Sequence, residues 1–411
     1  MPASKRELMF DYAKFFLILL VILDHIQLTN DYLDVWPLIA FFFISGYFYK
    51  RGRRTLGEFA KNRFQRLIIP FWVALLVNGL FELFRANYFG YCDSTIIVYP
   101  LLHAIWGSNF VPVPSFLDLS FLTPIPYREV GEGFIEVGTP STALLWFLPA
   151  LFSGSIMFYV YQEKLRRAPW FDAIAIPVLL LFTFSETLVF GSVQLPWGIG
   201  RGFFVCACMI VGRDIKDVDL FNKPRVLVPV AVVCLAVYVW FDTMGWIVAA
   251  FIPSFYGTMD FPELVTRYVP RLHAAMGSPG VFSAFVGCGC ATIAFLALMK
   301  LFTRIVKICK PLLYIGESTM AIYLWHIPCI TLFAVAFKEL FGMPITLEYW
   351  LLPLIPAEYV GFKLIAIAGS IGLCVLLNYA AHGIQKRLTG SPGYQGISAW
   401  LHKVGKDEVS S

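Results

Sequence analysis

The chain has 411 residues, of which 58% are hydrophobic and 14% are charged, and its mean hydropathy is +0.71. A soluble globular domain is nearer to about half apolar and about a quarter charged, so this composition excludes an ordinary soluble domain and predicts an integral membrane protein. The formal net charge of +5 is modest. No basic run interleaved with aromatic residues lies in a soluble domain, so nucleic acid is not an expected partner.

A helix needs roughly 20 mostly apolar residues to cross a membrane. The sequence predicts an all-α bundle of about ten transmembrane helices, at 8–30, 35–49, 67–85, 142–162, 172–190, 197–212, 226–241, 280–302, 311–336 and 360–381. Two further apolar runs, 94–106 and 245–257, are interrupted by proline and are predicted to be re-entrant or interfacial pieces. One membrane domain would thus cover 1–385, with a tail at 386–411.

Lysine and arginine are concentrated in alternate connecting segments. The basic set is the N-terminus, 50–66, 163–170, 213–225, 300–310 and the tail after 382. The positive-inside rule therefore places both termini in the cytoplasm and predicts a multi-pass protein of the cell membrane, the bacterial inner or plasma membrane. The first apolar run carries charge and no small-residue cleavage site follows it, so it is expected to remain as a span.

The first predicted span carries three polar residues, Lys14, Asp24 and His25, and the last two stand in the stretch LLVILDHIQL. A charge within a span is unfavourable and usually marks a functional site. On a helix, the eleven steps from Lys14 to His25 bring both onto one face, about 16 Å apart along the axis. The alternative is that Lys14 extends toward the interface and His25 is a hydrogen-bonded core residue.

The second predicted span ends in FFFISGY, and a basic segment that includes RFQR follows it. Gly46 permits close approach of a neighbouring backbone or ligand. Arg63 and Arg66 are expected on one helix face, where arginine forks suit phosphate oxygens. The alternatives are ordinary positive-inside charge and contact with anionic membrane lipid.

Further polar residues within spans are sorted by their expected depth. Glu82, Glu186, Arg201 and His326 fall in the outer half, with Asp24 and His25, whereas Ser45 falls in the inner half. Because such residues usually face a bundle interior or a wet cavity, we expect an outer acceptor pocket and an inner donor pocket. For each residue alone, an interhelical hydrogen bond is the alternative. The nine cysteines form no metal-ligand pattern, and no metal is expected.

The motifs taken together resemble the acyltransferase-3 family of membrane proteins. They are DYAKFFLILLVILDH, FFFISGY, RFQR and GESTMAIYLWH at 316–326, and the resemblance covers roughly 8–385. That family transfers acyl groups, often acetyl from acetyl-CoA, to sugars of surface or secreted glycans and related acceptors. Its hallmarks are a basic residue separated by ten residues from an essential histidine, and an R-x-x-R after the second span. Lys14, His25, Arg63 and Arg66 fall on those places.

This chain departs from the family pattern at two positions. Lys14 stands where many members have arginine, and lysine contacts a phosphate or carbonyl only as a point charge. Asp24 is outside the hallmark, so its role stays open between support of His25, contact with acceptor hydroxyls and contact with a neighbouring span.

The resemblance implies acetyl-CoA or another acyl-CoA as a cytoplasmic donor and a glycan or lipid-linked sugar as acceptor. Phosphates of the donor would contact Arg63, Arg66 and Lys14, and the thioester would lie near His25. A neutral imidazole there could act as general base, and Ser45 or Lys14 could stabilise the oxyanion. The rival interpretation is a polysaccharide exporter or flippase without such chemistry. The oligomeric state, monomer or homodimer, is left open.

Overall fold

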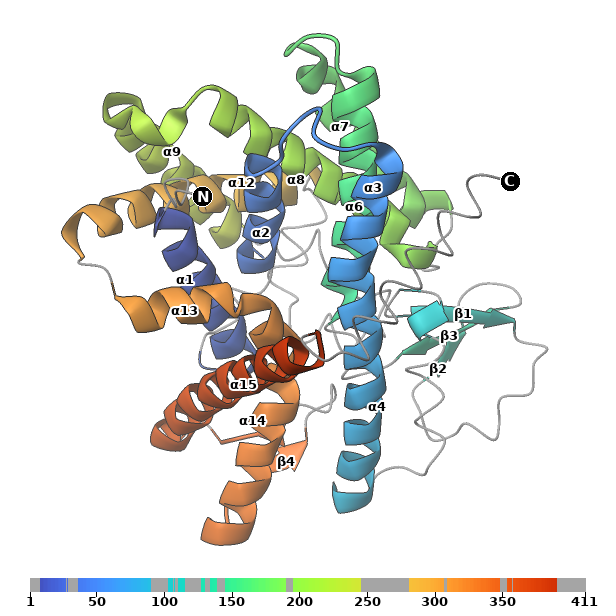
Figure 1. Cartoon of the computed structure of the whole chain (residues 1–411), viewed down its shortest axis with the longest axis vertical. Helices are drawn as coiled ribbons and strands as arrows, with labels where there is room; N and C mark the ends of the chain where they lie inside the picture. The colour runs from blue at the N-terminus through green and yellow to red at the C-terminus, as the bar shows by residue number, and fades with distance from the viewer. Residues whose placement is uncertain are drawn as a thin grey trace.

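The computed structural model of this protein describes residues 8–26, 28, 36–89, 103–105, 107, 110–114, 127–129, 134–138, 145–189, 195–244, 281–306, 309–347, 353–356 and 358–389. Within these ranges the protein is predominantly helical (Figure 1). The α-helices are α1 (Leu8–His25), α2 (Trp36–Tyr47), α3 (Leu56–Arg63), α4 (Ile69–Phe89), α6 (Phe147–Val160), α7 (Phe171–Val189), α8 (Ile199–Asp217), α9 (Pro224–Thr243), α12 (Val281–Ile305), α13 (Lys310–Glu317), α14 (Thr319–Phe341) and α15 (Val360–Thr389). Two π-helical segments, η1 (Phe64–Ile68) and η5 (Tyr161–Leu165), and two 3-10 turns, η6 (Pro196–Gly198) and η7 (Leu220–Asn222), adjoin them.

Several of these helices are long and apolar enough to cross a membrane. In the described part of the chain, 5 helices meet this requirement, at Leu56–Phe81, Pro224–Thr243, Val281–Ile305, Thr319–Phe341 and Val360–Gly383. The protein is therefore a multi-pass membrane protein, whereas the total of about ten spans stays a prediction. Helix α2, with 12 residues, is only about 18 Å long and is too short to cross the bilayer alone.

The region predicted as one span at 311–336 is divided into α13 and α14. The break lies at Ser318, whose backbone N–H contacts the carbonyl oxygens of Tyr314 and Ile315 at 3.0 Å. Helix α13 lies across α1 (Figure 1), and a Cβ at Gly316 would overlap the Asp11 carbonyl oxygen. The close backbone contact with α1 accompanies the change of direction, which an apolar pattern alone cannot indicate.

Two small antiparallel sheets depart from the all-α expectation. The larger contains β1 (Phe110–Pro114), β2 (Tyr127–Glu129) and β3 (Phe134–Gly138) in the order β1-β3-β2. Pro112 and Pro114 lie in β1, an edge strand, where the lost N–H is tolerated. The smaller sheet pairs β4 (Thr346–Leu347) with β5 (Pro353–Leu354). Both sheets lie in connecting segments between helices, so the helical membrane domain is unaffected.

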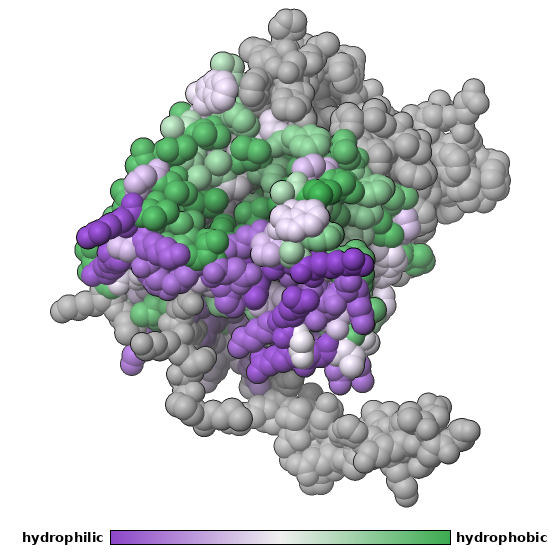
Figure 2. Space-filling view, turned by 90° about the horizontal axis from the view of Figure 1, so that it is seen from above, coloured by the Kyte–Doolittle hydropathy of each residue, from purple (hydrophilic) through white to green (hydrophobic). Residues whose placement is uncertain are grey.

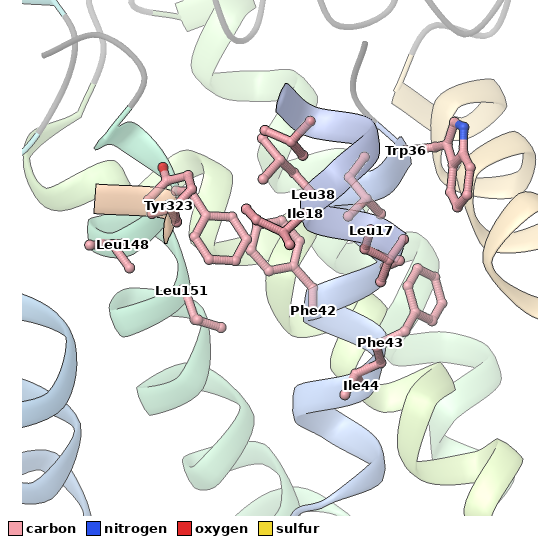
Figure 3. Packing of buried hydrophobic residues seen from close by; sticks show 14 of the residues in the cluster. Leu17, Ile18, Trp36, Leu38, Phe42, Phe43, Ile44, Leu148, Leu151 and Tyr323 are labelled. Carbon is pink, nitrogen blue, oxygen red and sulfur yellow. The ribbon is translucent and has the colours of Figure 1, made fainter. Parts of the chain in front are cut away.

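Helix α2 lies at the centre of the packed interior. Phe42 stacks on Phe147 with ring centroids 4.8 Å apart, and Figure 3 shows its side chain among those of Leu148, Leu151 and Tyr323. A Cβ at Gly46 would overlap the Met209 carbonyl oxygen, and one at Gly212 would overlap the Phe43 carbonyl oxygen. The backbones of α2 and α8 therefore touch through a reciprocal glycine pair, which is how small residues join membrane helices. The close approach expected at Gly46 is confirmed.

Candidate active site

Two histidines from distant parts of the chain meet where α1 approaches α14. The Nδ1 atom of His25, the last residue of α1, lies 2.8 Å from Nε2 of His326. Their rings are stacked, with centroids 5.0 Å apart and an interplanar angle of 12°. His326 is only 1% exposed, whereas His25 is half-buried. The pairing joins two residues that the sequence placed at similar depth without predicting their contact.

The hydrogen bonds around His326 determine which nitrogens carry protons. Its Nδ1 lies 2.9 Å from the Tyr323 carbonyl oxygen and 3.0 Å from that of Ile322. Carbonyl oxygens only accept, so Nδ1 of His326 donates, and Nε2 of a neutral His326 ring must then accept. Nδ1 of His25 is therefore the donor between the rings. In a neutral His25 the remaining nitrogen, Nε2, carries a lone pair that can accept a proton.

Aromatic rings connect the buried histidine to a buried arginine. Tyr323 lies 6.3 Å from the His326 ring and 5.4 Å from the Phe147 ring, measured between centroids. Phe147 adjoins Trp146 at 6.3 Å, and the Arg201 guanidinium lies 5.2 Å from the Trp146 ring centroid. Arg201 is 4% exposed and is close enough to His103 to interact electrostatically. An aromatic wall that ends in a cation is thus continuous with the histidine pair.

Three other residues were predicted in the outer half of the membrane, namely Asp24, Glu82 and Glu186. Asp24 is half-buried beside His25 in α1. Glu82 and Glu186 belong to α4 and α7, but their side chains lie outside the described residues. Their predicted contribution to an acceptor pocket therefore stays a prediction.

Lys14 and Ser45 lie away from the histidine pair along their helices. The Nζ atom of Lys14 is 3.5 Å from the Asp11 carboxylate and 5.9 Å from the Phe48 ring centroid, and its side chain is 32% exposed. The Ser45 hydroxyl donates to the Phe41 carbonyl oxygen of its own helix at 2.8 Å. Because this bond engages the hydroxyl proton, Ser45 does not supply an oxyanion donor in this rotamer.

Arg63 and Arg66 flank the start of a π-helical segment. Arg63 ends α3, and Arg66 lies within η1. Arg66 is exposed, whereas Arg63 is half-buried with its guanidinium 5.2 Å from the Phe59 ring centroid. Arg66 and Arg54 are both near enough to Arg63 to interact electrostatically. π-helical turns are frequent at functional sites, and here one occurs where three guanidinium groups gather.

The loop between α2 and α3 carries four exposed cations and is held by specific contacts. The cations are Lys50, Arg51, Arg53 and Arg54. Glu163 accepts from the Tyr49 hydroxyl at 2.7 Å and from the Gly52 backbone N–H at 2.9 Å. The Tyr159 hydroxyl donates to the Arg54 carbonyl oxygen at 2.7 Å. Figure 2 views this end of the molecule and shows hydrophilic side chains gathered beside a broad hydrophobic surface. The role of Glu163 was not predicted from the sequence, although an acidic residue within a basic segment was a usable signal.

A second polar network joins α7 and α8 beyond η5. Arg166 donates to Asp172 at 2.5 Å and to Asp214 at 3.0 Å, and Asp172 also accepts from the Tyr161 hydroxyl at 2.6 Å. Burial, followed by the charge of Asp172, raises the pKa of the Asp214 carboxyl to about 7, although Arg166 opposes the rise. The network fixes the helix ends beside the basic loop.

A sequence family model described as an acyltransferase domain, that of the acyltransferase-3 family, matches residues 8–379. The match covers most of the chain, which therefore belongs to this family. Together with its apolar helices, this makes the protein a multi-pass membrane acyltransferase. No curated protein and no solved structure matches it. Within the described residues no cluster of three His, Cys, Asp or Glu side chains could hold a metal ion.

Proposed function

We propose that this acyltransferase moves an acyl group, acetyl in the simplest case, from acyl-CoA on the cytoplasmic side to a hydroxyl on the outer side. The acceptor would be a glycan or a lipid-linked sugar. This orientation follows from the predicted arrangement of about ten spans with both termini in the cytoplasm. The observation that carries the proposal is the directed hydrogen bond from Nδ1 of His25 to Nε2 of His326, because it leaves a lone pair on the other nitrogen of His25.

In this mechanism His25 acts as general base. Nε2 of His25 takes the proton of the acceptor hydroxyl while its oxygen attacks the thioester carbonyl carbon. The carbon–sulfur bond then breaks, the thiolate leaves, and the proton on His25 passes to it, giving the acyl ester and free CoA. His25 is neutral before and after the reaction, so no charge is left in the membrane interior.

His326 is assigned a positioning role in this proposal. It accepts a hydrogen bond from the Nδ1–H of His25, and its own ring is oriented by the carbonyl oxygens of Ile322 and Tyr323. A group that fixes the tautomer and orientation of a catalytic histidine can contribute as much as the base itself. This contact favours a positioning role over direct acceptor binding.

The donor would bind through its phosphates at the basic end of the molecule. Arg63, Arg66 and the exposed cations of the α2–α3 loop supply positive charge there. Lys14 lies on the α1 face that leads toward His25, about 16 Å away along the helix. An extended thiol arm could follow this face from the phosphate site to the base. Trp146 and Arg201 would line the acceptor side, since an aromatic face and a cation suit sugars and their anionic substituents.

The proposal is tested with purified protein in lipid nanodiscs and acetyl-CoA labelled in the acetyl group. We expect label to move to an added glycan acceptor, with release of free CoA in equal amount. Acceptor-free samples and His25→Ala protein are the controls. Glycan translocation without label transfer, across a panel of acyl-CoA donors, would support the exporter instead and overturn the proposal.

A further inference from the structure

A long apolar groove runs between α9 and α12, and neither histidine of the pair belongs to its lining. It has a volume of about 440 Å³ and is lined by residues such as Leu227, Leu235, Phe295 and Leu298, with Trp36 at one end. This volume lies within the range of roughly 300–1,000 Å³ that is typical of ligand sites. Helix α9 is the least buried candidate span, with 11% of its apolar window covered by protein. The groove therefore faces the lipid.

Charge is confined to one end of the groove. Lys300 and Arg304 belong to its lining, at the end of α12 that adjoins the start of α9. Lys300 donates to the side-chain oxygen of Asn222 at 3.0 Å, a neutral acceptor that leaves its charge uncompensated. Within the described residues neither cation has a carboxylate partner. The N-terminus of α9, whose backbone dipole favours an anion, lies at the same end.

The groove is long enough to hold an acyl chain of one leaflet of a bilayer. From Pro224 to Tyr238, both in its lining, α9 rises about 21 Å. Half of a hydrocarbon core is about 15 Å, so a chain starting at Lys300 and Arg304 would occupy roughly the first two-thirds of this length. The walls between these ends carry only aliphatic and aromatic side chains. A peptide or sugar would leave its polar groups unsatisfied there, whereas an acyl chain would not.

We propose that this groove binds an anionic phospholipid of the cytoplasmic leaflet. One acyl chain would lie between α9 and α12, and the headgroup phosphate would contact Lys300 and Arg304. The leaflet follows from the predicted orientation, because the segment from Arg213 to Arg225 belongs to the basic set. The site is separate from the proposed chemistry and does not depend on it.

The test compares phosphatidylglycerol with phosphatidylcholine of the same acyl chains, added to delipidated protein and counted by native mass spectrometry. Wild-type protein should retain phosphatidylglycerol roughly thirtyfold better than phosphatidylcholine, as expected for two cations at a membrane surface. The double variant Lys300→Gln/Arg304→Gln should lose this preference. Lys164→Gln/Arg167→Gln, two exposed cations outside the groove, is the matched control and should keep it.

A second part of the experiment tests whether the acyl chain lies in the groove. Ala294→Phe narrows the groove without touching its charges and should lower retention of both lipids. Glycerol phosphate, which has the headgroup charge but no chain, should not displace bound phosphatidylglycerol. Equal retention of the two lipids by wild-type protein, an unchanged preference in the Lys300/Arg304 variant, or displacement by glycerol phosphate would each overturn the proposal. Acyl transfer is not the readout, so its absence would leave this result intact.

Discussion

The histidine pair and the basic loop between α2 and α3 differ in burial and in which of their atoms are held by contacts. His326 is almost fully buried, and its ring is fixed by carbonyl oxygens and by His25 at 2.8–3.0 Å. The cations between α2 and α3 are exposed, and it is their backbone that is held, through Glu163 and Tyr159. Proton transfer needs a single orientation of a neutral ring, whereas phosphate binding tolerates several side-chain positions within a region of positive charge. We therefore expect substitutions at the histidines to affect turnover and those in the basic region to affect donor affinity.

The largest expected effect is at His25. His25→Ala removes the proton acceptor and should lower turnover by at least about 10²–10⁴-fold, the usual contribution of a general base. Label transfer from acyl-CoA measures the rate, and gel filtration with a thermal melt checks that the variant folds. Wild-type turnover in well-folded His25→Ala protein would exclude the assignment of the base.

Two variants of His326 that lose different amounts of kcat would distinguish a positioning residue from a base. His326→Leu cannot accept a hydrogen bond from His25 and should lower kcat strongly, within the roughly 10⁴-fold seen when a catalytic histidine has the wrong tautomer. His326→Gln offers an amide oxygen as acceptor and should recover part of that loss. The KM for the acceptor should change little in either variant.

Equal activity of the His326→Leu and His326→Gln variants would argue against the tautomer role. A rise in the acceptor KM without a fall in kcat would instead support direct substrate contact by His326, as the sequence first predicted.

Removal of Arg63 or Arg66 should raise the KM for the donor and leave kcat unchanged, the reverse of the pattern expected at the histidines. Arg63→Ala and Arg66→Ala should each raise the KM for acyl-CoA by about tenfold to a hundredfold, since a charged hydrogen bond contributes roughly 1.5–3 kcal/mol. The kcat at saturating donor should stay close to that of wild type. Arg167→Ala, an exposed cation outside this cluster, is the control. If the two variants and the control behave alike, the arginines provide only general membrane-facing charge.

Loss of the Glu163 hydrogen bonds to the loop between α2 and α3 should have a smaller effect on the donor KM. Glu163→Ala frees the Tyr49 hydroxyl and the Gly52 N–H, and the looser loop should raise the donor KM by a few-fold, in line with about 1 kcal/mol for a lost hydrogen bond. Glu163→Gln keeps an oxygen acceptor and should lie closer to wild type. A decrease in kcat with unchanged KM would show that Glu163 acts elsewhere.

The smallest expected effect is a change in the pH dependence of stability at Asp214. Its folded-state pKa of about 7 exceeds the unfolded value of about 3.9, so the folded protein binds the proton more tightly between these values. Stability contributed by this group is complete below pH ~4 and falls as pH rises toward 7. Asp214→Asn should therefore flatten the pH profile of the melting temperature. Parallel profiles for variant and wild type would refute this.

Features that depend on a local pattern of residues could be predicted from the sequence. A basic residue and His25 at helical spacing, the family motifs and Gly46 as a contact point all follow from residues close together in the chain. Acyltransferase-3 membership is now shown, whereas the roles of the individual residues stay predictions. The similar depths of His25 and His326 followed from segment lengths alone.

Contacts between residues far apart in the chain could not be predicted from the sequence. The 2.8 Å contact between His25 and His326 joins residues 301 positions apart, and no periodicity indicates which faces of α1 and α14 meet. The break at Ser318 accompanies a close contact between Gly316 and the backbone of α1, which is distant in the sequence. The engagement of the Ser45 hydroxyl by Phe41 depends on a rotamer. The strands at 110–138 arise in a proline-rich segment whose composition suggests an irregular loop.

The contact between α1 and α14 also bears on how the enzyme is made. Helix α1 is synthesised before α14, which lies about 300 residues further along the chain. Until α14 is inserted, His326 is not there to accept a hydrogen bond from Nδ1 of His25, and either tautomer of the His25 ring is accessible. We expect a nascent or truncated chain that ends before His326 to hold donor without turning it over. Catalytic competence would then require that α14 has joined α1, because the tautomer of His25 is set only by that contact.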